Sequence, residues 1–280
     1  MAQKQELKSY AGSVAIVTGG ASGLGRALAE QLSDRGAAEV VIADQNQELA
    51  EEVANAINAK GGHATPVHVD VRDYDSVATL IKQTRQRAER LDYIFNNAGV
   101  LINGFTNQLS IYDWNHVIDI NLRGVINGMH AAYLEMRDQG FGHIVNTSSL
   151  VGLIPGPTVY STAKHGVVGA SVSLRSEAAD FNVRVSALCP GAIKTPMLEE
   201  GGRNQEVREE FVKRQKLSEP EALASDALDK VAKNKPIIVT PKSLKIGWWL
   251  YRIAPEFVVQ LARKERSALR ERVKERGVDV

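Results

Sequence analysis

The sequence predicts an α/β fold in which a doubly wound, mostly parallel sheet of seven strands carries helices on both faces. Two observations support this prediction. Short runs rich in Val and Ile recur along the chain, and the apolar residues within each run are nearly continuous rather than alternating, as in strands that are buried on both faces. Helical patterns separate these runs, which is typical of strands that lie parallel in one sheet.

The elements are expected in a regular order along the chain. The first helical pattern begins at Gly23 and ends near Arg35, and a second covers residues 46–62 and ends on two glycines, a common stop signal. Ser218 and Glu221 have the spacing of a capping box at the start of a later helix. The expected strands lie within residues 13–20, 39–44, 63–71, 92–99, 142–149, 182–191 and 236–241.

Length and composition restrict the class of protein. The chain has 280 residues, 44% of them apolar, and a formal net charge of +1. We expect one main domain over residues 1–241 and a helical extension over residues 242–280, because a chain of this size can bury one sizeable core. The near-neutral charge argues against a nucleic-acid partner. No metal site is expected.

The targeting signals and the cysteine content bear on location. The N-terminus lacks the apolar run of a secretory signal, and no apolar stretch is long enough to span a membrane. A single cysteine, Cys189, excludes an internal disulfide and suits a reducing compartment. We therefore expect a cytoplasmic protein.

The first expected strand runs into the glycine-rich stretch TGGASGLG, residues 18–25. Its glycines would let the backbone turn tightly and approach a pyrophosphate, and the N-terminus of the next helix offers free N–H groups to that anion. A flexible turn is the alternative. The residues expected to hold a dinucleotide here are Gly19, Ser22, Gly23, Leu24 and Gly25.

Asp44 ends the second expected strand, 19 residues after Gly25. Its carboxylate could accept hydrogen bonds from the adenosine ribose hydroxyls and would repel a 2′-phosphate. Two charges about 4 Å apart at intermediate dielectric repel by up to roughly 4 kcal/mol. Neither Ser22 nor Gln45 supplies a cation, so we expect NAD(H) rather than NADP(H). The alternative is that Asp44 caps the next helix.

Other strands also end on residues that suit a nucleotide. Asp70 could accept a hydrogen bond from an adenine amino group or cap its own loop, and Asn97 is better suited to joining strands than to chemistry. The stretch CPGAIKT, residues 189–195, offers amides and a threonine hydroxyl to a nicotinamide carboxamide. The cofactor contacts expected from these segments are Asp70, Val71, Asn97, Ala98, Gly99, Pro190, Gly191, Ile193 and Thr195.

Tyr160 and Lys164 lie four residues apart in one expected helix and so share a face. An ammonium beside a phenol favours the phenolate and lowers the tyrosine pKa from about 10, which makes the pair a candidate general acid/base. An exposed Tyr and Lys without a role is the alternative. Either Ser148 or Ser149, at the end of the fifth strand, could bind a substrate oxygen. Asn121 lies inside a helical pattern, which suggests a structural or water-holding role.

The motifs TGxxxGxG, NNAG, a strand-end serine, YxxxK and PGxxxT occur in this order. In this the chain resembles the single-domain short-chain dehydrogenase/reductase family, over roughly residues 11–200. The resemblance implies a Rossmann-type sheet and a homodimer or homotetramer built through the helices that carry Asn121 and Tyr160. It also implies a catalytic tetrad of Asn121, Ser149, Tyr160 and Lys164. Two of these residues would also bind the cofactor: Tyr160 contacts it, and Lys164 holds the nicotinamide ribose.

The resemblance selects Ser149 over Ser148, because a short stretch ending in glycine follows it. In the implied mechanism Tyr160 exchanges a proton with the alcohol oxygen while hydride passes between substrate and nicotinamide. Ser149 steadies that oxygen, Lys164 lowers the Tyr160 pKa, and Asn121 anchors a water that relays a proton from Lys164. The implied activity is an NAD-dependent interconversion of a secondary alcohol and its ketone.

The expected substrate pocket is apolar, and no Arg or Lys clearly converges on it. A hydrophobic secondary alcohol or ketone is therefore favoured over a carboxylate or phosphate. Residues 196–217 resemble the family's mobile lid, with Gly201 and Gly202 as a hinge. The residues expected to form the pocket wall are Leu101, Leu150, Ile154, Val159, Met197 and Leu198.

The extension beyond residue 241 is first apolar and aromatic and then charged. Trp248, Trp249 and Phe257 beside Lys245 and Arg252 could make a peripheral contact with a membrane interface. The alternative is that the aromatic residues cover the cleft or a subunit contact while the charged end is a solvated helix. Two other function classes stay open, an NAD(H)-binding sensor and a membrane-associated scaffold, but the complete tetrad favours an enzyme.

Overall fold

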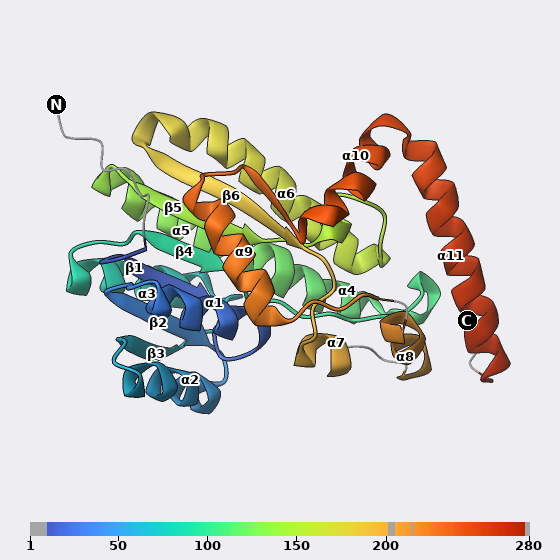
Figure 1. The fold of residues 1–280 in the computed structure, drawn as a ribbon, viewed down its shortest axis with the longest axis horizontal. Coiled ribbons are helices and arrows are strands. Elements are labelled where there is room, and N and C mark those ends of the chain that lie inside the picture. The colour runs from blue at the N-terminus through green and yellow to red at the C-terminus, as the bar shows by residue number, and fades with distance from the viewer. Residues whose placement is uncertain (1–9, 201–204, 214, 278–280) are drawn as a thin grey trace.

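The computed structural model describes residues 10–200, 205–213 and 215–277. Its seven strands form one parallel sheet in the order β3-β2-β1-β4-β5-β6-β7, which confirms the predicted fold class (Figure 1). The strands are β1 Val14–Thr18, β2 Glu39–Asp44, β3 Ala64–His68, β4 Tyr93–Asn96, β5 Gly142–Thr147, β6 Val183–Pro190 and β7 Ile237–Thr240. The helices are α1 Gly23–Asp34, α2 Gln47–Ala59, α3 Tyr74–Ala88, α4 Ile111–Ile118, α5 Gly124–Gln139, α6 Thr158–Ala178, α7 Pro196–Glu200, α8 Gln205–Lys213, α9 Pro220–Ala232, α10 Lys245–Ile253 and α11 Pro255–Glu275.

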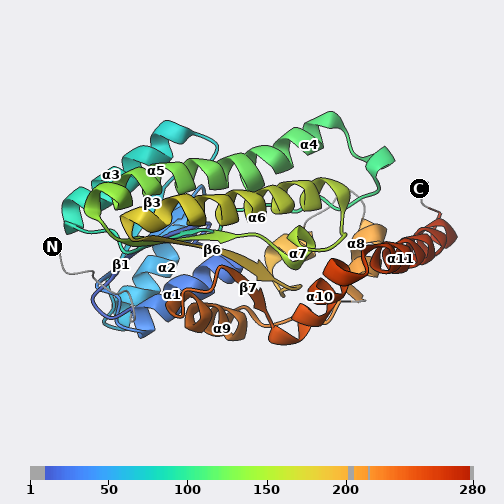
Figure 2. The same ribbon diagram turned by 90° about the horizontal axis from the view of Figure 1, so that it is seen from above.

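Two helical layers cover the sheet. Helices α1, α2 and α9 pack on one face, and α3, α5 and α6 pack on the other (Figure 2). Successive residues of β1 alternate between the two cores, so that Ala15 and Val17 pack with one layer and Ile16 with the other. All of β1 and β5 is buried. Burial on both faces explains why the strands read as continuous apolar runs.

The sheet changes its direction of winding at β1. This strand lies between β2 and β4, so the chain moves outward in opposite directions on its two sides. In open parallel sheets this arrangement creates a crevice at the carboxyl ends of the strands. The strand register aligns Thr18 with Ala43 and Asn96 with Asn146. The loops that carry the predicted site residues therefore begin along one edge.

One local prediction of a helix start is wrong. Helix α9 begins at Pro220, its N-cap residue is Glu219, and no side chain caps it. Ser218 is instead held by its backbone in a short bridge to the loop after β6. Its N–H donates to the Ala192 carbonyl at 3.0 Å, and its carbonyl accepts from Lys194 N–H at 3.1 Å. Pro220 has no backbone N–H, so the start of α9 has one fewer donor that needs a capping acceptor.

The extension after β7 forms α10 and α11, and α11 lies beside α8 (Figure 1). Helix α11 is tied to the body from two sides. Arg266 donates to the Gly156 carbonyl at 2.5 Å, and Arg276 pairs with Glu210 of α8 at 2.6 Å. The predicted helical extension is confirmed. Among the helices described, none combines the length and hydropathy that crossing a bilayer requires.

Candidate active site

A cleft of about 340 Å³ hollows the carboxyl edge of the sheet. It extends from the end of β2, past the glycine-rich loop after β1, to the loops that follow β5 and β6. Most of the residues predicted for the cofactor line it, namely Gly19, Ser22, Gly23, Leu24, Asp44, Asp70, Val71, Asn97, Ala98, Gly99, Pro190, Gly191, Ile193 and Thr195. Of the residues predicted for chemistry and substrate, the cleft is lined by Leu101, Ser149, Leu150, Tyr160, Lys164, Met197 and Leu198.

The loop between β1 and α1 forms a cradle that requires glycine. Gly19 and Gly23 have φ of +63° and +51°, in the left-handed region. A Cβ on Gly19 would lie 2.8 Å from the Ala98 Cα, and a Cβ on Gly23 would lie 2.9 Å from the Thr195 Cγ2. The N-cap Ser22 makes no side-chain capping bond, and no acidic residue occupies the first turn of α1. The free amides at this helix start therefore fit an anionic pyrophosphate.

The third predicted glycine acts by packing and does not line the cleft, which corrects the prediction for Gly25. A Cβ at this position would lie 1.9 Å from the Gly19 carbonyl oxygen, so only glycine lets α1 approach the loop. The loop is also held from β4. The Asn97 side chain donates to the Thr18 carbonyl at 3.2 Å. Asn97 thus joins β1 and β4 as predicted, while also lining the cleft.

Asp44 lies at the end of β2 with its carboxylate beside the glycine-rich loop. One oxygen accepts from Ala21 N–H at 3.1 Å, and the other accepts from Asn46 N–H at 3.0 Å. The alternative role as helix cap is wrong, because Asn46 is the N-cap of α2 and its side chain accepts from Leu49 N–H. The two amides fix the orientation of the Asp44 carboxylate at the cleft wall.

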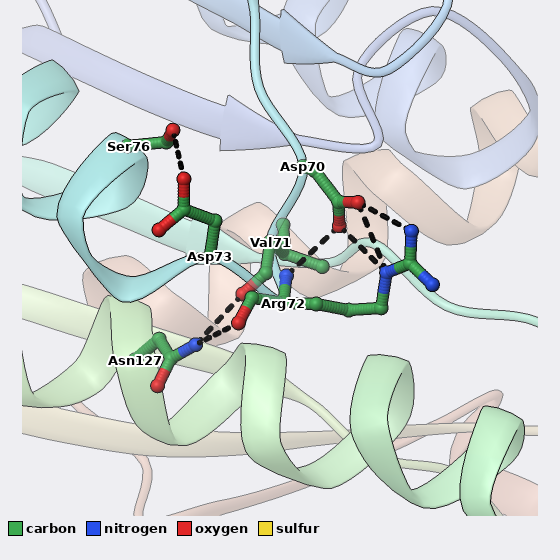
Figure 3. Close-up of polar contacts among 6 residues, drawn as sticks. All are labelled: Asp70, Val71, Arg72, Asp73, Ser76 and Asn127. Atoms are coloured by element: carbon green, nitrogen blue, oxygen red, sulfur yellow. Dashed lines mark hydrogen bonds and ion pairs between the residues drawn. The ribbon is translucent and has the colours of Figure 1, made fainter.

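Asp70 is held in an ion pair that the sequence did not predict (Figure 3). The Arg72 guanidinium donates to its carboxylate at 2.5 and 3.0 Å, and these bonds hold the pKa of Asp70 below its usual value. Arg72 N–H also donates to Asp70, so the residue caps its own loop as well as lining the cleft. Asn127 of α5 supports this loop by donating to the Val71 carbonyl at 2.9 Å. No local signal links Asn127 to the loop, because 56 residues separate it from Val71.

Tyr160 and Lys164 lie one turn apart on α6, and both face the cleft. The Lys164 Nζ lies 5.5 Å from the centre of the Tyr160 ring. It also donates to the Thr147 carbonyl at the end of β5, at 2.9 Å. Lys164 is buried, and burial lowers its pKa to about 8 because the ammonium loses its hydration. The lysine therefore changes charge close to physiological pH.

The pKa of Tyr160 lies above its ordinary value of about 10, whereas the sequence predicts a lowered pKa. Burial raises it to about 12, and a hydrogen bond with the Ser149 hydroxyl only partly opposes this rise. The net shift in the protein alone is therefore upward, because loss of hydration dominates it. At neutral pH the phenol holds its proton.

The two strand-end serines have different environments. The Ser148 hydroxyl is buried and donates to the Lys164 carbonyl at 2.8 Å, so it braces α6 against β5. The Ser149 hydroxyl bonds the Tyr160 side chain and accepts weakly from Val151 N–H at 3.4 Å. Only Ser149 is positioned to share a substrate oxygen with Tyr160.

We expect Ser149→Ala to lower kcat/KM for the alcohol by about 100-fold, because one donor to the developing oxyanion is lost. Ser148→Ala should instead lower the melting temperature while kcat/KM stays within a few-fold, since it removes a buried structural hydrogen bond. Steady-state kinetics and thermal melts of both variants test the assignment. A larger kinetic loss in Ser148→Ala would reverse it.

Asn121 lies in a π-helical turn, Asp119–Arg123, that joins α4 to α5. Its side chain is buried and is occupied at both ends, donating to the Val100 carbonyl and accepting from Val100 N–H, each at 2.7 Å. Asn121 does not line the cleft, and its role in holding a water stays a prediction. A Cβ on Gly99 would lie 3.0 Å from the Asn121 Oδ1 and 3.7 Å from the Lys164 Nζ. Asn121 thus fixes the backbone next to the lysine.

The substrate end of the cleft departs from prediction at two residues. Val159 is fully buried and packs with Val117 and Ala163, because it points about 100° away from its neighbour Tyr160 on α6. Ile154 packs on the core cluster that contains Leu153 and does not line the cleft. The expected hinge glycines lie outside the described residues.

Several residues that line this end were missed by sequence reasoning. Gln215 contributes a polar side chain from the segment after α8, and Thr147 contributes a buried hydroxyl oxygen that has no partner among the described residues. Thr147 is the last residue of β5, and ligands bind at the carboxyl ends of parallel strands, so its position in the sequence could have predicted it. The apolar residues missed are Ile120, Val151 and Pro157.

Known proteins share this fold and sequence. A model of the short chain dehydrogenase family matches residues 13–206. A 3-oxoacyl-[acyl-carrier-protein] reductase from Synechocystis sp. is 37% identical over 213 residues, covering 75% of this chain and 85% of that protein. A cyclohexanol dehydrogenase from Acinetobacter sp. is 36% identical over 215 residues, covering 75% and 84%. A short chain dehydrogenase/reductase from Burkholderia phymatum, crystallised in complex with NAD, superposes with a TM-score of 0.81 at 27% identity, covering 89% of this chain and 96% of that one. The chain therefore belongs to the short-chain dehydrogenase family.

Proposed function

We propose that this protein is an NAD(H)-dependent oxidoreductase that interconverts a hydrophobic secondary alcohol and its ketone. One observation carries the proposal. Tyr160, bonded to Ser149 and close to the Lys164 ammonium, faces the same cleft as the glycine cradle and the Asp44 carboxylate. A proton-transfer group and a dinucleotide site thus share one cavity.

The residues of the cleft fit a dinucleotide from end to end. The cradle at Gly19 and Gly23 suits the pyrophosphate, and the Asp44 carboxylate suits the two ribose hydroxyls of an adenosine without a 2′-phosphate. Thr195 and the loop amides after β6 suit the nicotinamide carboxamide. When bound, the nicotinamide supplies the hydride acceptor for oxidation and the hydride donor for reduction.

The side chains of the protein move the proton. In ketone reduction the Tyr160 phenol donates its proton to the carbonyl oxygen as the carbon gains hydride, and in oxidation the phenolate takes the proton from the alcohol. The Ser149 hydroxyl donates a hydrogen bond to the same oxygen. The Lys164 ammonium favours the phenolate and can hold the ribose of the nicotinamide half. Asn121 keeps the backbone beside Lys164 in place.

The apolar wall favours a substrate without a negative charge. Lys164 is the only cation among the described lining residues, and its ammonium already donates to a carbonyl. A cyclohexanol-like ring fits the proposal, in line with the relative that bears that name. A 3-oxoacyl thioester is the second candidate, because another relative is a 3-oxoacyl-[acyl-carrier-protein] reductase.

We expect kcat/KM for ketone reduction to be constant near neutral pH and to fall above about pH 8. The Lys164 pKa is lowered, so the ammonium loses its proton at a lower pH than an exposed lysine does, while the Tyr160 phenol stays protonated to about pH 12. The Lys164→Gln variant should lose most of its activity, and its remaining kcat/KM should no longer fall above about pH 8. A parent profile that stays flat to about pH 10 would contradict this role for Lys164.

The proposal is tested by incubating the purified protein with NAD⁺ or NADP⁺ and a panel of secondary alcohols, and by following reduced cofactor in the ultraviolet. Primary alcohols and 2-hydroxy acids serve as controls, and an acetoacetyl thioester with NADH tests the second substrate class. We expect NADH to form with ring-bearing secondary alcohols. Turnover confined to charged substrates, or to NADP⁺, would contradict the proposal.

We also propose a cytoplasmic homodimer or homotetramer that has no nucleic-acid partner and is built through α4, α5 and α6. The outer face of these helices carries exposed apolar side chains, as expected of a subunit contact. Light scattering on the purified protein measures the state directly. The exposed residues that support this surface are Ile111, Tyr112, Ile126, Leu134 and Val172.

A further inference from the structure

The elbow formed by residues 242–264, which contains α10 and the first half of α11, projects from the body of the protein (Figure 1). Its inner side is anchored. Trp248 packs against the core cluster around Leu153, and a Cβ on Gly191 would lie 2.4 Å from the Leu244 side chain. The outer side of the elbow has no such partner within the described chain, and its side chains are exposed.

The outer face of α10 is apolar. Ile246, Trp249 and Ile253 recur at helical spacing with 73%, 63% and 59% of their surface exposed. On α11, Phe257 and Leu261 continue the pattern at 59% and 48%. Single exposed apolar residues are common on proteins, but five large ones in sixteen residues form a patch that needs a partner.

Cations surround this patch. Residues 242–264 contain five Lys and Arg residues and one acid, Glu256. At about 100° per residue, Lys245 and Arg252 lie on one flank of α10 between Trp248 and Trp249, and the Arg252 guanidinium lies 5.7 Å from the centre of the Trp248 ring. The excess of positive charge covers the whole extension, because residues 242–280 contain ten Lys and Arg residues and five Asp and Glu residues. The whole chain, by contrast, has a net charge of only +1. The body without the extension is therefore acidic.

We propose that the elbow is a peripheral docking surface for an anionic lipid bilayer. An exposed apolar and aromatic face flanked by Lys and Arg is the combination that binds at the headgroup boundary. A second copy of this chain fits less well, because a two-fold contact would bring the cations of one elbow against those of the other. A nucleic acid would match the cations and leave the apolar side chains without a partner.

The elbow borders the substrate end of the cleft. Trp248 belongs to the same cluster as Leu150, which lines the cleft. A docked elbow would bring this end of the cleft close to the lipid phase, into which hydrophobic alcohols and ketones partition. This consequence rests on the proposed function, whereas binding of the elbow to lipid does not.

The test uses the full-length protein and sedimented vesicles of phosphatidylcholine, either pure or with about 30% phosphatidylglycerol, at about 50 and 500 mM salt. We expect at least about tenfold stronger binding to the anionic vesicles, weakened by salt. Lys245→Glu/Arg252→Glu should lower that affinity by more than about tenfold, since each cation contributes roughly fivefold. Trp249→Ser/Phe257→Ser should lower it by a similar factor.

A matched control is Leu49→Ser, which removes an exposed apolar side chain from α2 and should leave vesicle binding unchanged. Bromine-labelled acyl chains in anionic vesicles should quench tryptophan emission in the parent and much less in Trp249→Phe, a variant that keeps an aromatic ring. No binding to anionic vesicles, or equal binding by the elbow variants, would overturn the proposal. A loss of oligomer mass in Trp249→Ser would assign the patch to a contact between copies instead.

Discussion

Tyr160→Phe should lower kcat for secondary-alcohol oxidation by about a thousandfold or more while the dissociation constant for NAD(H) changes by less than about threefold. The variant keeps the ring and its packing but removes the hydroxyl that bonds Ser149 and would exchange the substrate proton. General acid–base catalysis contributes about 10²- to 10⁴-fold. The cradle and Asp44 lie on other elements, so cofactor binding does not depend on this hydroxyl. Stopped-flow turnover and fluorescence titration with NADH measure the two quantities separately.

The matched control is Tyr112→Phe, which removes a hydroxyl from an exposed tyrosine on α4. Its turnover should equal that of the parent. If Tyr160→Phe kept more than about a tenth of parental kcat, Tyr160 would not be the acid/base, and the proton would have to pass through another group.

Asp44→Asn should shift the cofactor preference from NAD(H) toward NADP(H) by about tenfold to a thousandfold in the ratio of kcat/KM values. Asparagine has nearly the same shape and keeps an oxygen that can accept from Ala21 or Asn46, so the loop should hold its conformation. Its loss of charge removes a repulsion of up to roughly 4 kcal/mol toward a 2′-phosphate. The ratio for the parent and the variant is measured with one alcohol at saturation.

Asp138→Asn, which removes an exposed carboxylate far from the cleft on α5, controls for the change in net charge and should leave the ratio unchanged. A parent that uses both cofactors equally, or an Asp44→Asn variant with the parental ratio, would show that this carboxylate does not select the cofactor.

The parts of the site that depend on topology could be predicted from the sequence. Parallel strands bring their carboxyl ends to one edge, so the positions of Asp44, Asp70 and Thr195 at strand ends suffice to place them in one cleft. The glycine loop was predictable for the same reason. The YxxxK spacing placed Tyr160 and Lys164 on one helix face, because i and i+4 are neighbours on any helix.

The parts that depend on tertiary packing could not be predicted. The Tyr160 pKa is set by how deeply the ring is buried, which spacing does not reveal. The Asn121 side chain is occupied because a π-helical turn brings it onto Val100, and no sequence pattern marks that turn. Val159 was predicted to line the pocket, but it is adjacent to Tyr160 on α6 and therefore points about 100° away from it, into the core. The support of the Asp70 loop by Asn127 joins segments that are far apart in the chain.

The central claim is a direct hydride transfer in the cleft with Tyr160 as the proton-transfer group. It is tested by supplying NAD⁺ with a hydrophobic secondary alcohol that carries deuterium on its carbinol carbon, and then measuring the mass of the reduced cofactor. We predict that the deuterium appears in the reduced nicotinamide of the parent and that almost no labelled cofactor forms with Tyr160→Phe. Deuterium released to water, or equal labelling by the variant, would contradict the account.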